Sequence, residues 1–342
     1  MPKALALISG GLDSTLAAAL VKEQGVPVHG LTFVSLFNAA KAPRGRLLAS
    51  QFSARQIGIP LTIVNWSRRL LELVKAPAYG HGANMNPCID CRLDVLTMAR
   101  DRMVELGCDF VITGEVLGER PMSQRRQPMD MVRKRSGLGG LLLRPLSAKL
   151  LEPTIPEQRG WIARERMLEI KGRSRKPQME LAKRLGITEY PSPAGGCLLT
   201  DPAFSAKLSD LLSHDPEAQV NDAHLLKVGR HFRLFPSAKL VVGRNHRENG
   251  VVASYARQGD ILLEAADFVG PAALLRGANT PEALSLSAAI AAAYGKGRRE
   301  PAVRVGWRAV GGGAGVVEVA PSNQSAISQF RIAGENRRRG PE

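Results

Sequence analysis

The sequence predicts an α/β fold, a doubly wound parallel sheet, followed by a smaller C-terminal α+β domain. Short apolar runs alternate with helical stretches over residues 3–146, as they do in βαβ units. The first apolar run, residues 4–8, leads through a glycine-bearing turn into a helix rich in Ala and Leu. Beyond residue 222 the pattern changes to alternating strands, which favours a separate module.

The N-terminal elements follow from the spacing of apolar residues and from helix stop signals. Strands are expected at 3–8, 26–34, 60–65, 109–113 and 141–146, and helices at 14–23, 45–57, 89–106, 156–169, 177–185 and 202–213. Residues 120–140 are basic, contain glycine and lack a clear period, so we expect a mobile loop there. Ligands of such a sheet bind beyond the carboxyl ends of its strands.

The C-terminal module is expected to begin after a polar boundary at 215–222. Its expected elements are strands at 233–243, 251–257 and 260–265 and a helix at 282–293. Three consecutive glycines at 311–313 predict little order beyond them. The expected division is therefore 1–214 for the α/β domain, 222–312 for the smaller α+β domain and 313–342 for a flexible basic tail.

Composition limits the class of protein. The chain has 342 residues, 44% of them hydrophobic, which fits a packed globular protein of two or three domains. No run of 18 apolar residues predicts a membrane span. Residues 1–3 lead at once into the first strand, leaving no room for a signal peptide, so we expect a cytoplasmic protein.

The charge favours a polyanionic partner. The net charge is +16, and basic residues cluster at 125–126, 133–135, 171–176, 296–299 and 337–339. Nucleic acid is the commonest polyanion in a cytoplasm, so we expect RNA or DNA binding. A generally basic proteome is the alternative explanation. Aromatic residues make up only 5% of the chain, which gives no sign of a stacking platform for single strands.

Residues 9–14, Ser-Gly-Gly-Leu-Asp-Ser, form the turn between the first strand and the first helix. Two glycines let backbone N–H groups approach an anion, and the helix N-terminus adds unpaired N–H groups and a partial positive charge. The carboxylate of Asp13 suits a Mg²⁺ ion that bridges phosphate oxygens. The lysine of the common nucleotide-binding loop is absent. The sequence therefore predicts a phosphate site, rather than a mere glycine-rich turn.

The cysteines form a second constellation. Cys88 and Cys91 stand at the start of a helix, where the pKa of each thiol should be depressed, and Cys197 follows two glycines in a tight turn. A structural zinc site would need a fourth ligand, for which Cys108 and His81 are poor choices. A dithiol–disulfide pair would leave Cys197 without a role. The third alternative is a [4Fe–4S] cluster on three cysteines with one iron open, or a persulfide on Cys197 that Cys88 or Cys91 resolves.

Cys108 lies apart from this constellation, between Gly107 and a core strand, and we expect it to be a small buried hydrophobe.

These motifs together resemble the PP-loop tRNA thiolation enzymes, the 4-thiouridine synthases and tRNA 2-thiouridylases. Residues 9–14 match the signature of the PP-loop ATP pyrophosphatases, which have the adenine nucleotide alpha hydrolase-like fold. The other motifs are Gly-x-Asn-Met-Asn-Pro-Cys-x-Asp-Cys (82–91), Thr-Gly-Glu (113–115), Arg-Pro-Met-Ser (120–123), Arg-Pro-Leu-Ser (144–147) and Gly-Gly-Cys-Leu-Leu-Thr (195–200). The resemblance covers about residues 1–212. The C-terminal module resembles, more weakly, the RNA-binding domain of the NFACT family.

The resemblance implies that ATP adenylates a uridine carbonyl oxygen of tRNA, releasing pyrophosphate, and that sulfur then displaces AMP. It assigns the ATP phosphates and Mg²⁺ to Ser9, Gly10, Gly11, Asp13 and Ser14, with Thr113 and Gly114 on the opposite lip. Catalysis would involve Asp13 together with Cys88, Cys91 and Cys197, which would present sulfur with or without a [4Fe–4S] cluster. The partners implied are tRNA and a separate sulfur donor, such as a cysteine desulfurase or sulfide.

Two other classes of function compete. A PP-loop ligase or amidotransferase acting on a small molecule would not need three cysteines, a charge of +16 or a basic module. A non-catalytic RNA-binding protein would not need an intact phosphate loop. Thiolation of tRNA accounts for all of these features together.

Overall fold

The computed structural model describes residues 1–38, 48–190 and 197–332. The chain divides into two compact units, Met1–Cys197 and Leu198–Glu342. The division precedes the expected boundary at 215–222, because helix α8 (Pro202–His214) packs against its C-terminal neighbours: Asp210 on α8 accepts hydrogen bonds from Arg233 and Lys239 of the second unit. Each unit is described by itself below.

The first unit contains the expected parallel sheet, which confirms the α/β prediction. Its five strands lie in the order β3-β2-β1-β4-β5, and every pair is parallel. The strands are β1 (Ala4–Leu7), β2 (Val28–Val34), β3 (Leu61–Asn65), β4 (Phe110–Ile112) and β5 (Leu142–Leu143). Because β1 pairs with both β2 and β4, the chain reverses its direction of winding beside β1, where ligands bind in such sheets.

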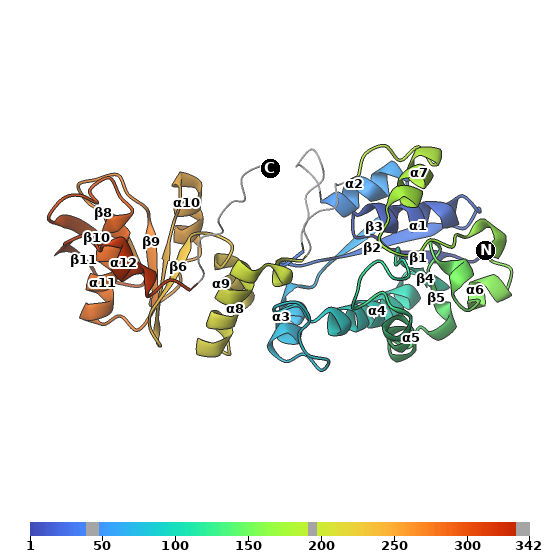
Figure 1. The fold of residues 1–342 in the computed structure, drawn as a ribbon, viewed down its shortest axis with the longest axis horizontal. Coiled ribbons are helices and arrows are strands. Elements are labelled where there is room, and N and C mark those ends of the chain that lie inside the picture. Colours follow the sequence, from blue (N-terminus) through green and yellow to red (C-terminus); the bar gives the residue numbers. More distant parts are fainter. Residues whose placement is uncertain (39–47, 191–196, 333–342) are drawn as a thin grey trace. The chain divides into compact units, whose positions relative to one another are not determined.

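Helices cover both faces of this sheet (Figure 1). On one face, α1 (Leu12–Lys22) and α7 (Lys176–Arg184) share a core with Ala4, Ala6 and Ile112. On the other face, α4 (Cys88–Glu105) and α5 (Arg126–Arg135) pack over Leu5 and Val111. The alternation of buried side chains along β1 thus feeds two cores, as a doubly wound sheet requires.

Three short helices complete the first unit: α2 (Ala49–Gln56), α3 (Ser67–Lys75) and α6 (Ile155–Gln158). The helix expected at 156–169 ends after one turn, and one 3-10 turn, Arg164–Arg166, follows it in that range. The mobile loop expected at 120–140 is wrong over 126–135, which forms α5. Met129 and Val132, three residues apart, bury one face of that helix. The start of the helix expected at 45–57 and the tight turn expected at 191–196 lie outside the described residues.

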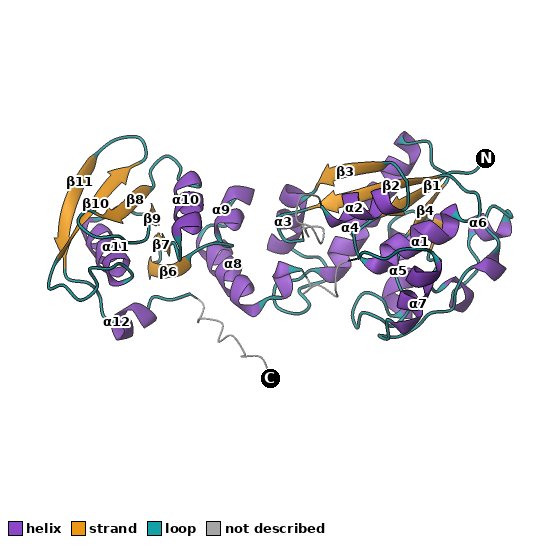
Figure 2. Cartoon of the chain, turned by 90° about the horizontal axis from the view of Figure 1, so that it is seen from above, coloured by secondary structure: helices purple, strands orange, loops and turns teal. Residues whose placement is uncertain are grey.

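The second unit is an antiparallel sheet with helices, as expected for an α+β domain (Figure 2). Its strands lie in the order β11-β10-β8-β9-β7-β6. They are β6 (Arg230–Phe235), β7 (Ala238–Val242), β8 (Ile261–Ala265), β9 (Ala273–Gly277), β10 (Val303–Ala309) and β11 (Ala314–Val319). Helix α11 (Pro281–Ala293) packs on one face, and α9 (Val220–Leu225) and α10 (His246–Ser254) contribute to a smaller core with Val241 and Leu274.

Several C-terminal expectations are corrected. The strand expected at 233–243 is the hairpin β6–β7, and the strand expected at 251–257 is mostly the end of helix α10. Asn245 is the N-cap of α10, because its side chain accepts a hydrogen bond from the backbone N–H of Glu248. The sequence prediction missed this cap because it assigned the apolar residues 251–253 to a strand. The disorder expected from residue 313 is wrong up to 328, because β11 pairs with β10 and α12 (Gln324–Ser328) follows.

Among the described residues, no helix combines the length and the apolar character that crossing a membrane requires.

Candidate functional site

The phosphate loop is preformed by its own serines. The Ser9 and Ser14 hydroxyl oxygens lie 3.0 Å apart, and the Ser14 hydroxyl also donates to the Gly11 carbonyl oxygen at 3.0 Å. The backbone N–H of Gly11 donates to the Ser9 hydroxyl at 3.3 Å. Gly11 is the N-cap of α1 and has no side chain with which to cap it, so the first N–H groups of α1 remain for a ligand.

Two glycines make the loop geometry possible. Gly10 has φ +85°, and a Cβ there would lie 2.5 Å from the backbone of Ala49 on α2. Gly114, just beyond β4, approaches α1 so closely that a Cβ would lie 2.5 Å from the Asp13 carbonyl carbon. The backbone after β4 therefore lies directly against the loop, with Thr113 beside it at 1% exposure. Residues 9–14 and 113–114, which the sequence predicted to share a site, are neighbours.

Asp13 has the environment of a residue that awaits a ligand. Its Oδ1 is buried and has no hydrogen-bond partner among the described residues. Burial raises the pKa of the carboxyl, and Arg175, Gln178 and Arg120 lower it, with the net pKa above the ordinary value. A bound cation would lower that pKa and occupy the free oxygen.

Glu115, in contrast, is fully paired with neighbouring side chains. Its carboxylate accepts from Arg92 Nε and Arg144 Nε, both at 2.7 Å, and from the Thr113 hydroxyl at 3.1 Å. Burial alone would raise its pKa, but Arg92 and Arg144 outweigh burial and hold the pKa at about 2. Arg92 is the residue after Cys91, so this buried cluster ties the start of α4 to the strand end beside the phosphate loop.

Cys88 and Cys91 occupy the first turn of α4, as expected. The loop before the helix is fixed by Asp90, whose carboxylate accepts from the N–H groups of Ala78 and Tyr79 at 2.9 and 3.2 Å. The Asn86 amide donates to the Cys88 sulfur at 2.9 Å. Both thiols are half-buried and held by a local network rather than by mobile chain.

The expected depression of the cysteine pKa values is wrong. Burial raises the pKa of Cys88, although Arg120 and Asn86 lower it. Burial, then the neighbouring Cys197 and Cys88, raise the pKa of Cys91 to about 12, with Arg92 opposing them. Desolvation outweighs the helix N-terminus here. Cys88 and Cys197 therefore both lie within electrostatic reach of Cys91.

The described residues give no support to a zinc site in which Cys108 or His81 is the fourth ligand. Cys108 is 7% exposed in the core with Met103 and Val111, which confirms its prediction as a buried hydrophobe. His81 donates through Nε2 to the Val74 carbonyl oxygen at 2.9 Å. Within 1–38, 48–190 and 197–332, no group of three His, Cys, Asp or Glu side chains is arranged to hold a metal ion.

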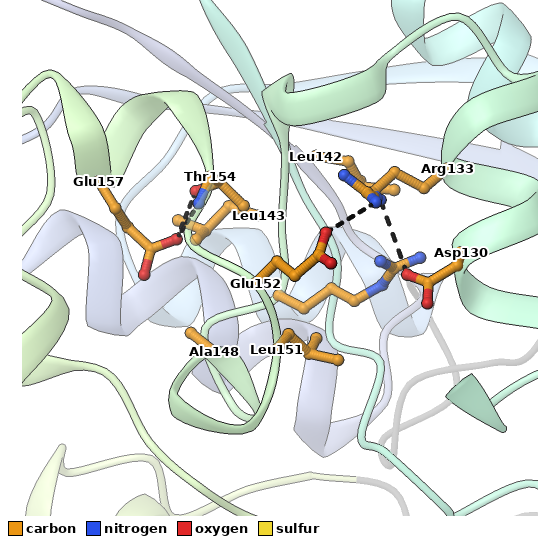
Figure 3. A pocket seen from close by; sticks show the side chains of 10 residues that line it. Asp130, Arg133, Leu142, Leu143, Ala148, Leu151, Glu152, Thr154 and Glu157 are labelled. Carbon is orange, nitrogen blue, oxygen red and sulfur yellow. Dashed lines mark hydrogen bonds and ion pairs between the residues drawn. The ribbon is translucent and has the colours of Figure 1, made fainter. Parts of the chain in front are cut away.

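A small cavity beside β5 is not a substrate site (Figure 3). Its volume is about 20 Å³, enough for about one water molecule. It is lined by Arg133, which contacts Glu152 at 3.2 Å, and by Leu142 and Leu143 of the strand. Part of the basic stretch on α5 is therefore already paired with acidic side chains.

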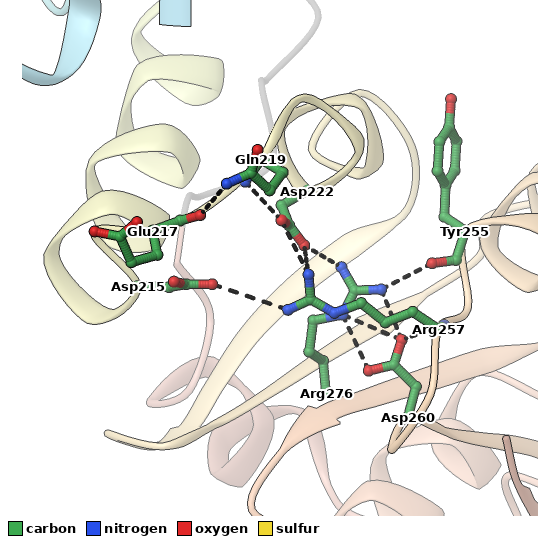
Figure 4. Close-up of polar contacts among 8 residues, drawn as sticks. All are labelled: Asp215, Glu217, Gln219, Asp222, Tyr255, Arg257, Asp260 and Arg276. Atoms are coloured by element: carbon green, nitrogen blue, oxygen red, sulfur yellow. Dashed lines mark hydrogen bonds and ion pairs between the residues drawn. The ribbon is translucent and has the colours of Figure 1, made fainter. Parts of the chain in front are cut away.

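In the second unit an ionic network around the buried carboxylates of Asp222 and Asp260 joins α9 to the sheet (Figure 4). Asp222 contacts Arg276 at 2.7 Å and Arg257 at 3.0 Å, and Asp260 contacts Arg276 at 2.6 Å. Arg257 and Arg276 therefore stabilise the packing of α9 on the sheet. The exposed cations Arg298, Arg299 and Arg308 form no ion pair among the described residues, so they are available to a polyanion.

Sequence reasoning found the loop and the cysteines but missed their supports. Arg92 and Arg144 complete the Glu115 cluster, and Arg144 stands in a motif that the sequence singled out without giving it a role. Arg120 and Gln178 act on Asp13 from outside the loop. Nothing in the sequence marks Gln178, because a lone Gln in a short helix is typical of a solvated face.

Two family models match separate parts of the chain. Residues 1–149 match the family described as thiamine biosynthesis protein (ThiI), and residues 229–331 match the NFACT protein RNA binding domain. The resemblance to the PP-loop tRNA thiolation enzymes is confirmed. The match includes the phosphate loop, both α4 cysteines and residues 113–115, and it ends before Cys197.

Curated relatives agree with the family models. The chain is 33% identical over 147 residues to tRNA-specific 2-thiouridylase MnmA of Bartonella quintana, covering 38% of this chain and 35% of that protein. It is 32% identical over 168 residues to MnmA of Chloroflexus aurantiacus, covering 45% and 47%. The chain thus spans less than half the length of these relatives.

A solved 4-thiouridine synthetase–RNA complex with bound ATP aligns at 21% identity with a TM-score of 0.38, covering 65% of this chain and 53% of that one. That TM-score is too low for the alignment to support a conclusion about this protein.

Proposed function

We propose that this protein is an ATP-dependent tRNA sulfurtransferase that makes thiouridine, and that it acts in the cytoplasm. The observation that carries the proposal is the joining of two sites in one unit. A phosphate loop without lysine is connected, through the Glu115 cluster and its Arg92, to the start of α4, which carries Cys88 and Cys91. A small-molecule ligase has no need of the second site, and a passive RNA-binding protein has no need of the first.

The residues present fit the phosphates of ATP with Mg²⁺. Gly10 and Gly114 let neighbouring backbone close around the loop, since a Cβ at either would collide with that backbone, and Asp13 Oδ1 is a buried oxygen without a partner among the described residues. Ser9, Gly11 and Ser14 would donate to phosphate oxygens, and Asp13 would hold the metal ion. Mg²⁺ supplies charge neutralisation when bound. Thr113 would lie on the opposite lip of the nucleotide.

The proposed chemistry has two steps. A uridine carbonyl oxygen attacks the α-phosphorus of ATP, and the bond to pyrophosphate breaks. A sulfur nucleophile then attacks the activated carbon, and AMP leaves with the former carbonyl oxygen. Thiouridine, AMP and pyrophosphate are the products. This loop holds the phosphates through backbone and hydroxyl donors, which suits release of pyrophosphate as a unit.

The cysteines would deliver the sulfur. On the persulfide route, the terminal sulfur of a Cys197 persulfide forms the new C–S bond, and Cys88 or Cys91 closes a disulfide with Cys197 that an external dithiol reduces. A separate donor reloads the site: a cysteine desulfurase transfers the terminal sulfur of its own persulfide to the reduced Cys197 thiol, or sulfide takes the place of the dithiol and attacks Cys197 in the disulfide, which restores the persulfide as the other cysteine leaves as a thiol. A [4Fe–4S] cluster on the same three residues is the other version, but the described side chains form no metal-holding group, so no step is assigned to it.

The substrate would be tRNA, held in part by the second unit. The match to the NFACT RNA binding domain and the exposed, unpaired cations Arg298, Arg299 and Arg308 support this assignment. Arg257 and Arg276, by contrast, are paired with Asp222 inside the unit.

Nucleoside analysis of tRNA tests the proposal. Total tRNA from a strain that lacks the gene should lose one thiolated uridine, and the wild-type gene should restore it. A gene that encodes Asp13→Ala should fail to restore it, because the metal-binding carboxylate is lost. An unchanged set of thiolated nucleosides in the deletion strain would contradict the proposal.

A further inference from the structure

A run of basic side chains leads into helix α7, and the proposed function gives it no role. Residues 170–179 contain four basic residues and no acidic one. Three of them, Lys171, Arg173 and Lys176, are exposed, and none of the three forms an ion pair within 1–38, 48–190 and 197–332. Positive charge that gathers without a counter-charge attracts a polyanion.

Backbone contacts place the start of this run beyond the carboxyl end of β4. The Gly172 N–H donates to the Leu117 carbonyl oxygen at 2.8 Å, and Lys171 forms a parallel bridge with Leu117. Leu117 follows closely after Gly114, whose backbone lies against the phosphate loop. The basic run therefore begins at the edge of the sheet that carries the loop.

The direction of α7 gives the same placement. Helix α7 packs on α1, and Arg184 at its end contacts Glu23, the C-cap of α1, at 3.7 Å. The two helices have similar lengths, so helices that end side by side on one face of the sheet also begin at one edge. Because α1 begins at the phosphate loop, Lys176, the first residue of α7, lies at that edge too.

One further exposed cation joins the run. The Gly118 N–H donates to the Gln124 carbonyl oxygen at 2.7 Å, and a Cβ on Gly118 would lie 3.6 Å from the Gly172 nitrogen. Arg125, the residue after Gln124, is exposed and has no ion pair in the described part of the chain. These contacts gather four exposed cations into a basic rim: Arg125, Lys171, Arg173 and Lys176.

Basic residues at the opposite edge of the same sheet are paired. Helix α4 ends shortly before β4 begins, so its last turns lie at the amino ends of the strands. There Arg100 contacts Asp101 at 2.7 Å, and Arg102 contacts Glu105 at 2.5 Å. The lack of carboxylate partners is therefore a property of the basic rim and not of every basic residue on this unit.

We propose that the basic rim binds the phosphate backbone of tRNA and holds it at the edge of the sheet that carries the phosphate loop. Arginine binds phosphate oxygens through pairs of hydrogen bonds, and lysine adds a point charge. RNA is favoured over an acidic protein because residues 229–331 of the same chain match an RNA binding domain. The first unit thus has an RNA surface of its own. The proposal rests on the proposed function in taking tRNA as the RNA.

Binding of tRNA to the full-length protein at several salt concentrations tests the rim. The triple variant Lys171→Ala/Arg173→Ala/Lys176→Ala should reduce the slope of log affinity against log salt by about 3, roughly one for each lost phosphate contact. At low salt it should weaken binding at least about tenfold. Circular dichroism should show an unchanged fold, because the three side chains are exposed and unpaired. Wild-type affinity and slope in this variant would overturn the proposal.

Arg102→Ala/Lys183→Ala/Arg184→Ala is the matched control, since it removes the same charge from exposed positions at the opposite edge of the unit. It should change the slope by less than about 1. Equal losses in the two triple variants would show that only net charge matters and would overturn the assignment to this edge. Poly-L-glutamate tests for an acidic protein partner: its binding through the rim, with tRNA binding unchanged, would also overturn the proposal.

The outcomes separate this proposal from the proposed function. If the rim variant loses tRNA affinity while tRNA from the deletion strain keeps all its thiolated uridines, the RNA surface stands and the proposed function fails. If the deletion strain loses a thiolated uridine while the rim variant binds tRNA with wild-type affinity and slope, the proposed function stands and the rim has no part in tRNA binding.

Discussion

Glu115 shows how one buried carboxylate connects two functional elements. Its ion pairs with Arg92 and Arg144, both at 2.7 Å, are nearly excluded from solvent on the Glu115 and Arg144 side. Glu115→Gln leaves Arg144 charged and unpaired, so we expect a loss of about 3–5 kcal/mol in the free energy of unfolding. Urea denaturation measures it. The control is Glu72→Gln, which removes an exposed pair with Lys75 and should change stability by less than about 0.5 kcal/mol.

The same carboxylate predicts a pH dependence of stability. Its pKa is about 2 in the folded protein against an ordinary value of 4.5, so its stabilising contribution is complete above 4.5 and is lost as the pH falls towards 2. Urea midpoints at pH 6 and pH 3 should therefore differ more for the wild type than for Glu115→Gln. Equal pH dependence in the two proteins would show that Glu115 is not the group that titrates.

The cysteines predict slow reaction at neutral pH. Burial raises the pKa of Cys88 and brings that of Cys91 to about 12, so both resting thiols are protonated at pH 7. Alkylation by iodoacetamide, followed by peptide mass spectrometry, should accelerate about tenfold per pH unit from 7 to 9, because only the thiolate reacts. A plateau reached below pH 8 would instead show a depressed pKa and an activated thiol.

At the scale of elements, the contact between the segment after β4 and the start of α1 is the feature most sensitive to change. A Cβ at Gly114 would collide with the backbone of Asp13 and Ser14. Gly114→Ala should therefore abolish ATP binding, measured by equilibrium dialysis, while the protein remains folded by circular dichroism. Gly250→Ala is the control, because nothing lies within 4 Å of its Cβ position and the residue lies inside helix α10. Normal ATP affinity in Gly114→Ala would place the nucleotide elsewhere.

The sequence predicted elements well where apolar periodicity and boundaries agreed, and poorly where side-chain contacts decide the structure. The strands and helices around residues 9–14 each have a clear period and a glycine stop. The end of helix α10 was predicted as a strand because its β-branched valines are typical of strands, although Asn245 caps the helix. Strand β11 was missed because its order comes from pairing with β10, a non-local contact that glycines at 311–313 do not prevent. Such contacts leave no local signal.

The site was predictable to a similar extent at the scale of the whole molecule. Motifs placed Asp13, Cys88 and Cys91 at strand ends and helix starts, which topology alone brings to one edge of the sheet. The burial that raises the cysteine pKa values and the unpaired Gln178 amide depend on packing between distant segments. Sequence patterns record which residues are present there, but not how deeply each is buried.

The whole-molecule charge predicts how tRNA affinity depends on salt. Replacing both Arg298 and Arg299 by alanine should weaken tRNA binding and reduce the slope of log affinity against log salt by about 2, roughly one for each lost phosphate contact. Filter binding at several salt concentrations measures both quantities. Replacing Arg257, which is paired with Asp222, should change the slope less. An unaltered slope in the double variant would remove this surface from the tRNA interface.

The account joins ATP cleavage and sulfur transfer on one tRNA, and product analysis of the purified protein tests that link most directly. With tRNA, Mg²⁺–ATP and sulfide under anaerobic conditions, AMP and pyrophosphate should form in step with thiouridine, and omission of tRNA should suppress both. Iron content before the reaction distinguishes the cluster version from the persulfide version. Formation of ADP and phosphate, or of AMP without any thiolated uridine, would contradict the account.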